Sequence, residues 1–152
     1  MTNPRSVWVD ADACPRAVRE ILFRAADRVG IPVTLVANQH IQTPRSPNVR
    51  SVQVPSGIDA ADSHIAQSVN AGDLVVTQDI PLAAEVIEKG AIAIGPRGAT
   101  YTPENIRERL RMRDFMDLLR GTGVATGGPP PFGKKDRAQF ANAIDRWLAE
   151  PK

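Results

Sequence analysis

Five aspartates follow short apolar runs of the sequence, at the points where strands of a parallel sheet would end. They are Asp10, Asp12, Asp59, Asp62 and Asp79. Because the carboxyl ends of parallel strands share one edge of a sheet, we expect these carboxylates to lie near one another. Carboxylates at close range raise each other's pKa values and destabilise the fold unless a cation neutralises them. Hard oxygen ligands suit Mg²⁺ or Mn²⁺, so the pattern predicts a divalent-metal site.

Helix capping is the alternative explanation for three of these residues. Asp59 could be a helix N-cap with Asp62 three positions later, and Asp79 could cap the next helix along the chain. Capping does not account for the first two aspartates, because Pro15 at the first helical position would make Cys14 the cap. Both explanations stay open for the other three.

Strands that alternate with helices are expected to position these side chains. Strands are predicted at 6–9, 32–37, 49–54, 74–77 and 91–94, and helices at 15–29, 59–69, 80–89, 102–119 and 134–150. This alternation favours an α/β fold with a mainly parallel five-stranded sheet and helices on both faces. The apolar side of the fourth helix is formed by Met112, Phe115, Met116 and Leu119. We expect one domain over residues 1–152, in which a loop rich in glycine and proline, 121–133, precedes the last helix.

Composition places the chain among ordinary globular proteins and excludes several classes. Of its 152 residues, 42% are hydrophobic and 24% are charged, which does not fit a disordered chain. No apolar run approaches the length of a membrane span, and the first residues lack a signal core. The single cysteine, Cys14, cannot form an internal disulfide. We therefore expect a cytoplasmic protein without a membrane partner.

Basic residues gather between positions 97 and 137, where nine of them stand against five acidic ones. This excess of four exceeds the net charge of +2 of the whole chain. These charged residues either form ion pairs with nearby residues on a solvent-exposed helix face or contact phosphates beside the metal site. The candidate nucleic-acid-binding residues are Arg97, Lys134, Lys135 and Arg137, and Arg97 is expected to face the site. Phe132 with the two lysines could clamp a single strand, or this loop could only return the last helix to the core.

Four motifs lie in a fixed order over nearly the whole chain. They are Val9-Asp-Ala-Asp-Ala-Cys-Pro15, Gly57-Ile-Asp-Ala-Ala-Asp-Ser-His-Ile65, Thr77-Gln-Asp-Ile-Pro-Leu82 and Gly127-Gly-Pro-Pro-Pro-Phe-Gly-Lys-Lys-Asp-Arg137. Together they resemble the bacterial YaiI/YqxD family, which is grouped with PIN-like domains. The resemblance implies a PIN-like three-layer sandwich.

PIN-like nucleases hold one or two divalent ions with acidic side chains at the strand ends, and the metal activates water for attack on a phosphodiester. By position, Asp10 matches the first-strand aspartate of that fold and Asp79 the aspartate after the fourth strand. Asp59 or Asp62 stands for the acid of the middle helix. Many PIN nucleases have a further acid just after the fourth-strand aspartate, where this chain is apolar over Ile80-Pro-Leu-Ala-Ala84, and Asp12 would replace it. The resemblance thus implies catalytic roles for Asp10, Asp12 and Asp79, and metal binding by all five aspartates.

Three functions compete on this basis. The first is Mg²⁺- or Mn²⁺-dependent cleavage of RNA or other single-stranded nucleic acid. The second is phosphomonoester hydrolysis of the haloacid-dehalogenase type, because Asp10-Ala-Asp12 after a first strand resembles that nucleophile motif. The shortness of the chain and the lack of a lysine ahead of a late aspartate pair weigh against it. The third is a non-catalytic RNA-binding or regulatory module that keeps the PIN-like scaffold.

Overall fold

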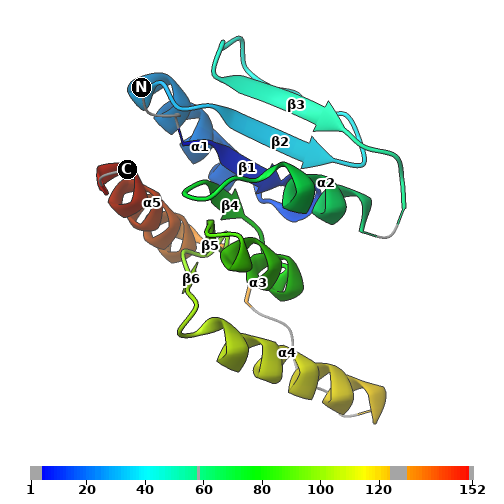
Figure 1. Ribbon diagram of the computed structural model, residues 1–152. Coiled ribbons are helices and arrows are strands. Elements are labelled where there is room, and N and C mark those ends of the chain that lie inside the picture. The colour runs from blue at the N-terminus through cyan, green and yellow to red at the C-terminus, as the bar shows by residue number, and fades with distance from the viewer. Residues whose placement is uncertain (1–4, 58, 124–129, 151–152) are drawn as a thin grey trace.

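The computed structural model describes residues 5–57, 59–123 and 130–150 of the chain. These residues form one sheet with helices packed on both of its faces (Figure 1). The strands are β1 (Val7–Asp10), β2 (Val33–Ala37), β3 (Val49–Gln53), β4 (Leu74–Val76), β5 (Ile92–Ile94) and β6 (Thr100–Tyr101). The helices are α1 (Arg16–Val29), α2 (Ala60–Ser68), α3 (Ile80–Glu88), α4 (Ile106–Gly121) and α5 (Lys134–Ala149), with a 3-10 turn, η1 (Ala11–Ala13), after β1. Within the described ranges no helix is long and apolar enough to span a bilayer.

The six strands have the order β3-β2-β1-β4-β5-β6. Strands β1 to β5 are parallel, which confirms the mainly parallel sheet, and β6 runs antiparallel to β5. The prediction of five strands is wrong by this sixth strand, which pairs Tyr101 with Ala93. Because β6 is only two residues long, the sequence has no alternating pattern from which this strand could be predicted.

Strand order reverses between β1 and β4. The chain runs from β1 outward through β2 to β3 and then returns to β4, on the other side of β1. Val9 pairs with Leu35 on one side and with Val76 on the other, and Asp10 extends β1 one residue beyond its pairing with β4. In open α/β sheets the crevice at such a reversal, beyond the carboxyl ends of the strands, is where ligands bind.

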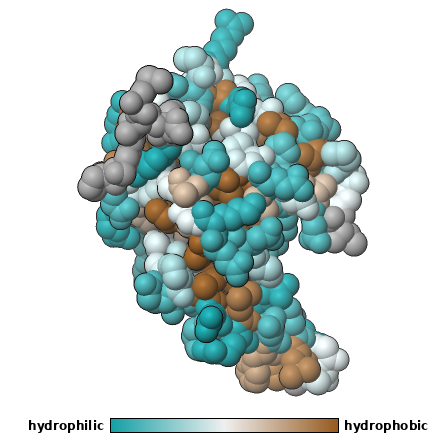
Figure 2. Space-filling view, viewed as in Figure 1, coloured by the Kyte–Doolittle hydropathy of each residue, from teal (hydrophilic) through white to brown (hydrophobic). Residues whose placement is uncertain are grey.

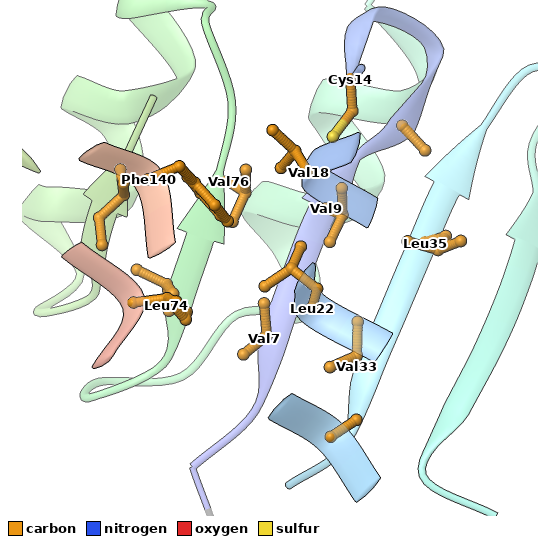
Figure 3. Packing of buried hydrophobic residues seen from close by; sticks show 14 of the residues in the cluster. Val7, Val9, Cys14, Val18, Leu22, Val33, Leu35, Leu74, Val76 and Phe140 are labelled. Carbon is orange, nitrogen blue, oxygen red and sulfur yellow. The ribbon is translucent and has the colours of Figure 1, made fainter. Parts of the chain in front are cut away.

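Helices α1 and α5 cover one face of the sheet (Figure 3). Val18 and Leu22 of α1 and Phe140 of α5 are fully buried there, in one cluster with Val9 of β1 and Val76 of β4. The spacing of four residues places Val18 and Leu22 on the same side of their helix. This face holds the larger part of the core.

The first helix ends as predicted but begins one residue later, at Arg16, so Cys14 is not its cap. Pro15 occupies the N-cap position with φ −59°, the value to which its ring restricts it. Gly30 ends the helix in the left-handed conformation, with φ 74°, and its N–H donates to the carbonyl oxygen of Ala26 at 2.8 Å.

Helices α2 and α3 cover the opposite face, together with the first turn of α4 (Figure 1). Trp8 belongs to this second cluster with Ile65 of α2 and Leu82 of α3, whereas its neighbours Val7 and Val9 belong to the first. Since successive strand residues point to opposite faces, β1 is apolar on both, as is typical of a sheet covered on both sides. The fold is thus three layers: helices, sheet, helices.

Helix α4 leaves the body of the protein after its first turn. Ile106 is its one buried residue, and the helix then extends past the edge of the sheet (Figure 1). Met112, Phe115 and Leu118 expose 54%, 53% and 65% of their surface. Figure 2 shows this apolar surface toward the free end of the helix. The predicted apolar side therefore exists, but much of it faces solvent.

Helix α5 begins at Lys134, in agreement with the sequence. Its start is fixed by Asp136, whose Oδ2 accepts a hydrogen bond from the backbone N–H of Gly133 at 3.0 Å. Of the predicted loop 121–133, residues 124–129 lie outside the described part of the chain.

A buried carboxylate joins β1 and β4 at their amino ends. Asp73 is 4% exposed, and its Oδ1 accepts from the backbone N–H of Ser6 at 3.0 Å. Its Oδ2 accepts from Trp8 Nε1 at 3.1 Å and from the backbone N–H of Asn70 at 2.9 Å. Three donors on one side chain hold the two central strands in register at the edge opposite to the predicted metal site.

Candidate metal centre at the carboxyl edge of the sheet

Thr77 connects the first and the fourth strand at the edge where the aspartates were expected. Its side chain is buried, and its hydroxyl donates to Asp10 Oδ2 at 3.0 Å. The Thr77 hydroxyl oxygen itself accepts from the backbone N–H of Asp79 at 3.0 Å. One hydroxyl therefore ties the carboxylate at the end of β1 to the backbone of the aspartate after β4. The convergence predicted for Asp10 and Asp79 is present.

Asp79 serves as a helix cap and also belongs to the acidic edge. Its Oδ1 accepts from the backbone N–H of Leu82 at 3.0 Å, so the capping interpretation of this residue is confirmed. Its charge also lies close enough to Asp62 of α2 to raise the pKa of that carboxyl group. Like charges at close range disfavour ionisation, so one of two neighbouring carboxyl groups holds its proton more tightly. Asp62 and Asp79 thus form an acid pair across the crevice.

The pKa of Asp62 reflects this crowding. Burial raises it, and the proximity of Asp79, with the charges of Asp10 and Asp59, raises it further to about 7. The pKa of Asp10 is raised as well, chiefly by burial, against the lowering effect of the Thr77 hydroxyl. The charges of Asp79 and Asp12 add to that increase. The carboxylates are therefore close enough to oppose one another's ionisation.

Asp59 and Asp12 occupy the margins of this group. Asp59 stands at the predicted N-cap position of α2, with φ 65°, but its side chain makes no capping hydrogen bond. A left-handed conformation costs a non-glycine residue roughly 1–2 kcal/mol, although aspartate tolerates it better than most. Asp12 is exposed on η1, and its Oδ2 accepts from the backbone N–H of Asn38 at 2.8 Å, after the end of β2.

A cavity of about 400 Å³ lies beside the acid pair, between α2, α3 and α4. Asp59, Asp62 and Asp79 line it, and so do two residues that the sequence did not single out, Glu85 of α3 and Arg113 of α4. Glu85 is the first residue after the apolar stretch in which a further acid was sought. Its position one helical turn after Pro81 is the signal that could have found it.

The chemistry of the donors fits a hydrated hard cation. All of the converging side chains are carboxylates, the ligands that Mg²⁺ and Mn²⁺ prefer. In the part of the chain that the structure describes, no three acidic, histidine or cysteine side chains form a ready-made metal cage. Mg²⁺ is commonly held by one or two carboxylates while it keeps several waters, whereas a structural zinc site needs four protein ligands. A site of one or two of these carboxylates completed by waters would match the first arrangement, not the second.

The predicted nucleic-acid-binding residues lie in two different settings. Arg97 donates to Asp136 Oδ2 at 2.8 Å and to the carbonyl oxygen of Pro130 at 2.6 Å. Its guanidinium lies 5.8 Å from the ring centre of Phe132. It lines a cavity on the α5 side, distinct from the cavity of the acid pair. The other three, Lys134, Lys135 and Arg137, are exposed on the first turn of α5.

The raised pKa of Asp62 predicts how stability depends on pH. Between about pH 4 and pH 7 the folded chain keeps a proton that the unfolded chain has released, so this group destabilises the fold progressively as pH rises through that window. Asp62→Asn removes the effect. We expect the Tm of the variant relative to wild type to increase from about pH 5 to about pH 8, as measured by thermal unfolding without metal. An equal difference at both pH values would contradict the crowding of these carboxylates.

The fold and the site together define an α/β protein with a mainly parallel sheet and carboxylates gathered where its strand order reverses. The chain belongs to the YaiI/YqxD family: the family described as "Uncharacterized BCR, YaiI/YqxD family" matches residues 8–150. A UPF0178 protein of Yersinia pestis (strain Pestoides F) is 61% identical over 146 residues, or 96% of each chain. A UPF0178 protein of Yersinia pseudotuberculosis serotype I (strain IP32953) matches to the same extent. No solved structure matches the chain.

Proposed function

We propose that this protein is a Mg²⁺- or Mn²⁺-dependent phosphodiesterase that cleaves single-stranded RNA, on a PIN-like scaffold. One observation carries the proposal: Asp10, Asp62 and Asp79 gather at the strand-order reversal, where burial and the charges of neighbouring carboxylates raise the pKa values of Asp10 and Asp62. A divalent cation would neutralise the excess negative charge. Proton and metal compete for the same oxygens, so metal binding displaces the proton of the acid pair.

Asp10 and Asp79 would hold the ion, with Asp62 or Asp12 as further ligands. When bound, such an ion activates water and stabilises the leaving oxygen of a phosphodiester. The protein prepares the ligands through its own hydrogen bonds. Thr77 orients the Asp10 carboxylate, and the Leu82 N–H fixes one oxygen of Asp79. These contacts reduce the rotamer freedom that ligand binding would otherwise remove.

The basic residues supply the electrostatic part of the proposal. Lys134, Lys135 and Arg137 are exposed and available to phosphates, and Arg97 holds the first turn of their helix through its contact with Asp136. Contacts of this type bind a flexible strand without reading its sequence. We therefore expect RNA binding that weakens with salt and varies little between sequences.

The haloacid-dehalogenase alternative finds less support. Its nucleophile motif is followed by a lysine ahead of a late aspartate pair, and none of the described residues that line the acidic cavity is a lysine. Lys89, at the end of α3, donates to the carbonyl oxygen of Ala66. Efficient Mg²⁺-dependent hydrolysis of an aryl phosphate would nevertheless favour this alternative over a nuclease.

The test is cleavage of a single-stranded RNA by wild type and Asp79→Asn, with Mn²⁺ and with EDTA. We expect slow cleavage by wild type that requires the metal. The variant should lose at least about 100-fold in rate, because it loses a metal ligand, and should still bind RNA. Equal cleavage by both proteins would assign the activity to a contaminant, and binding without cleavage in either would favour the non-catalytic module. Absence of RNA binding at low salt would refute the proposal.

A further inference from the structure

Helix α4 carries an unusual stripe of residues along one side. Positions 106, 110, 113, 117 and 120 fall on one side of a helix, at spacings of four and three residues. Ile106 and Leu110 begin this stripe as apolar residues, of which Ile106 is buried. It continues as Arg113, Asp117 and Arg120. Of the charged residues on this side, Arg113 lines the acidic cavity, while the apolar residues Met112, Phe115 and Leu118 of the helix are exposed.

Arg113 is the cation of that cavity. Among the described residues that line it, Asp59, Asp62, Asp79 and Glu85 are acidic and Arg113 alone is basic. With four acids to one arginine, the cavity repels an anion unless a divalent cation is also present. An anion that does enter with a metal ion meets one side chain able to contact two of its oxygens, since a guanidinium has parallel N–H donors.

The present contacts of Arg113 can be exchanged readily. It pairs with Asp114 Oδ1 at 3.2 Å and with Asp117 Oδ2 at 3.5 Å, both on its own helix. The side chains of Arg113, Asp114 and Asp117 are 44%, 72% and 46% exposed, and pairs as open as these contribute little to stability. Arg97 differs, because its pair with Asp136 is more enclosed, at 35% and 19% exposure, and a carbonyl oxygen also holds it.

We propose that Arg113 binds a phosphate of the substrate strand next to the metal site, so that the strand enters between α4 and α3. The proposal rests on the proposed function, since it needs the metal to admit the phosphate. Arg113 would then act as a substrate-binding residue that the exposed lysines of α5 cannot replace, because they do not line this cavity. Phosphate contact at Arg113 should require the divalent ion, whereas contact at the exposed lysines should not.

The experiment compares Arg113→Ala with Arg111→Ala, a matched control on the opposite side of the same helix. Arg111 is 71% exposed and pairs with Glu108. Binding of an oligouridylate of about ten nucleotides is measured by fluorescence anisotropy against salt, with Mn²⁺ and with EDTA. In Mn²⁺ we expect Arg113→Ala to weaken binding about 10-fold and to reduce the salt slope by about 0.7, the value for one contact on a single strand. In EDTA it should bind like wild type.

Arg113→Lys should recover part of the loss, because it keeps the charge but not the paired donors. The rise in Tm caused by Mn²⁺ is measured on the same proteins and should be unchanged in Arg113→Ala. If Arg113→Ala and Arg111→Ala weaken binding equally in Mn²⁺, the inference is overturned while the proposed function stands. If wild type shows neither a Tm shift with Mn²⁺ nor Mn²⁺-dependent binding, the proposed function fails and the inference fails with it.

Discussion

Asp10→Asn is expected to abolish the stabilisation of this protein by Mn²⁺. At free Mn²⁺ about 100 times its Kd, binding to the folded state adds about 2.7 kcal/mol to the free energy of unfolding. For a chain of this size that is roughly 5–10 °C in Tm. Asparagine keeps the shape of the side chain and an oxygen that can accept from Thr77, but it removes the charge that the ion needs. The shift is measured by thermal unfolding over a Mn²⁺ titration.

The matched control is Asp145→Asn. Asp145 lies on α5, pairs with Arg28 at 3.1 Å and has an exposed side chain away from the carboxyl edge. It should keep the full Mn²⁺ shift, whereas a general effect of net charge would change both variants alike. A shift that survives in Asp10→Asn would place the ion elsewhere or show that it binds without specificity. Without metal, Asp10→Asn should be at least as stable as wild type near neutral pH, because burial and neighbouring charges disfavour the Asp10 carboxylate.

Asp73→Ala should cause the largest loss of stability that we predict. It leaves the N–H groups of Ser6, Asn70 and the Trp8 indole without their acceptor. Each buried donor left unsatisfied costs about 1–3 kcal/mol. For the removal of a buried, hydrogen-bonded carboxylate we therefore expect the free energy of unfolding to drop by roughly 3–5 kcal/mol. Urea unfolding at neutral pH gives the free energy directly, and tryptophan fluorescence should report the release of Trp8.

Asp73→Asn separates hydrogen bonding from packing. The amide can replace one carboxylate oxygen, and so keep Trp8 and Asn70 bonded, but its NH₂ group then faces the N–H of Ser6. We expect a loss between those of wild type and Asp73→Ala. A loss under about 0.5 kcal/mol for Asp73→Ala would show that water satisfies these donors and that the contact does not hold β1 to β4.

The sequence was sufficient to place the main strands and the acidic edge. Apolar runs at β1, β2, β4 and β5 are short and end at polar residues, so their limits are local properties of the chain. Once these strands are parallel, their carboxyl ends meet, and the position of Asp10 relative to Asp79 follows from topology alone. This is why the approach of these two residues could be predicted without any knowledge of side-chain contacts.

Features that depend on distant partners could not be predicted in this way. The burial of Asp73 depends on donors supplied by Ser6 and Trp8, more than sixty positions away in the sequence. The entry of Arg113 into the acidic cavity depends on the angle at which α4 leaves the sheet, and neither spacing nor propensity encodes that angle. Asp79 both caps α3 and belongs to the acid pair, because its two carboxylate oxygens permit both roles, and its sequence position alone does not reveal the second.

Fibres grow when one chain adds a strand to the exposed edge of another chain's sheet. The two outermost strands of this sheet decide whether that can happen here. On one side the sheet ends in β6, which has two residues and therefore too few backbone hydrogen-bonding groups to hold a strand of another chain. On the other side β3 carries the exposed Arg50, and Pro55 follows shortly after it, features that oppose pairing with a further strand. Concentrated solutions of the folded protein should therefore stay free of cross-β polymers, and any self-association is directed to the apolar surface of α4 instead.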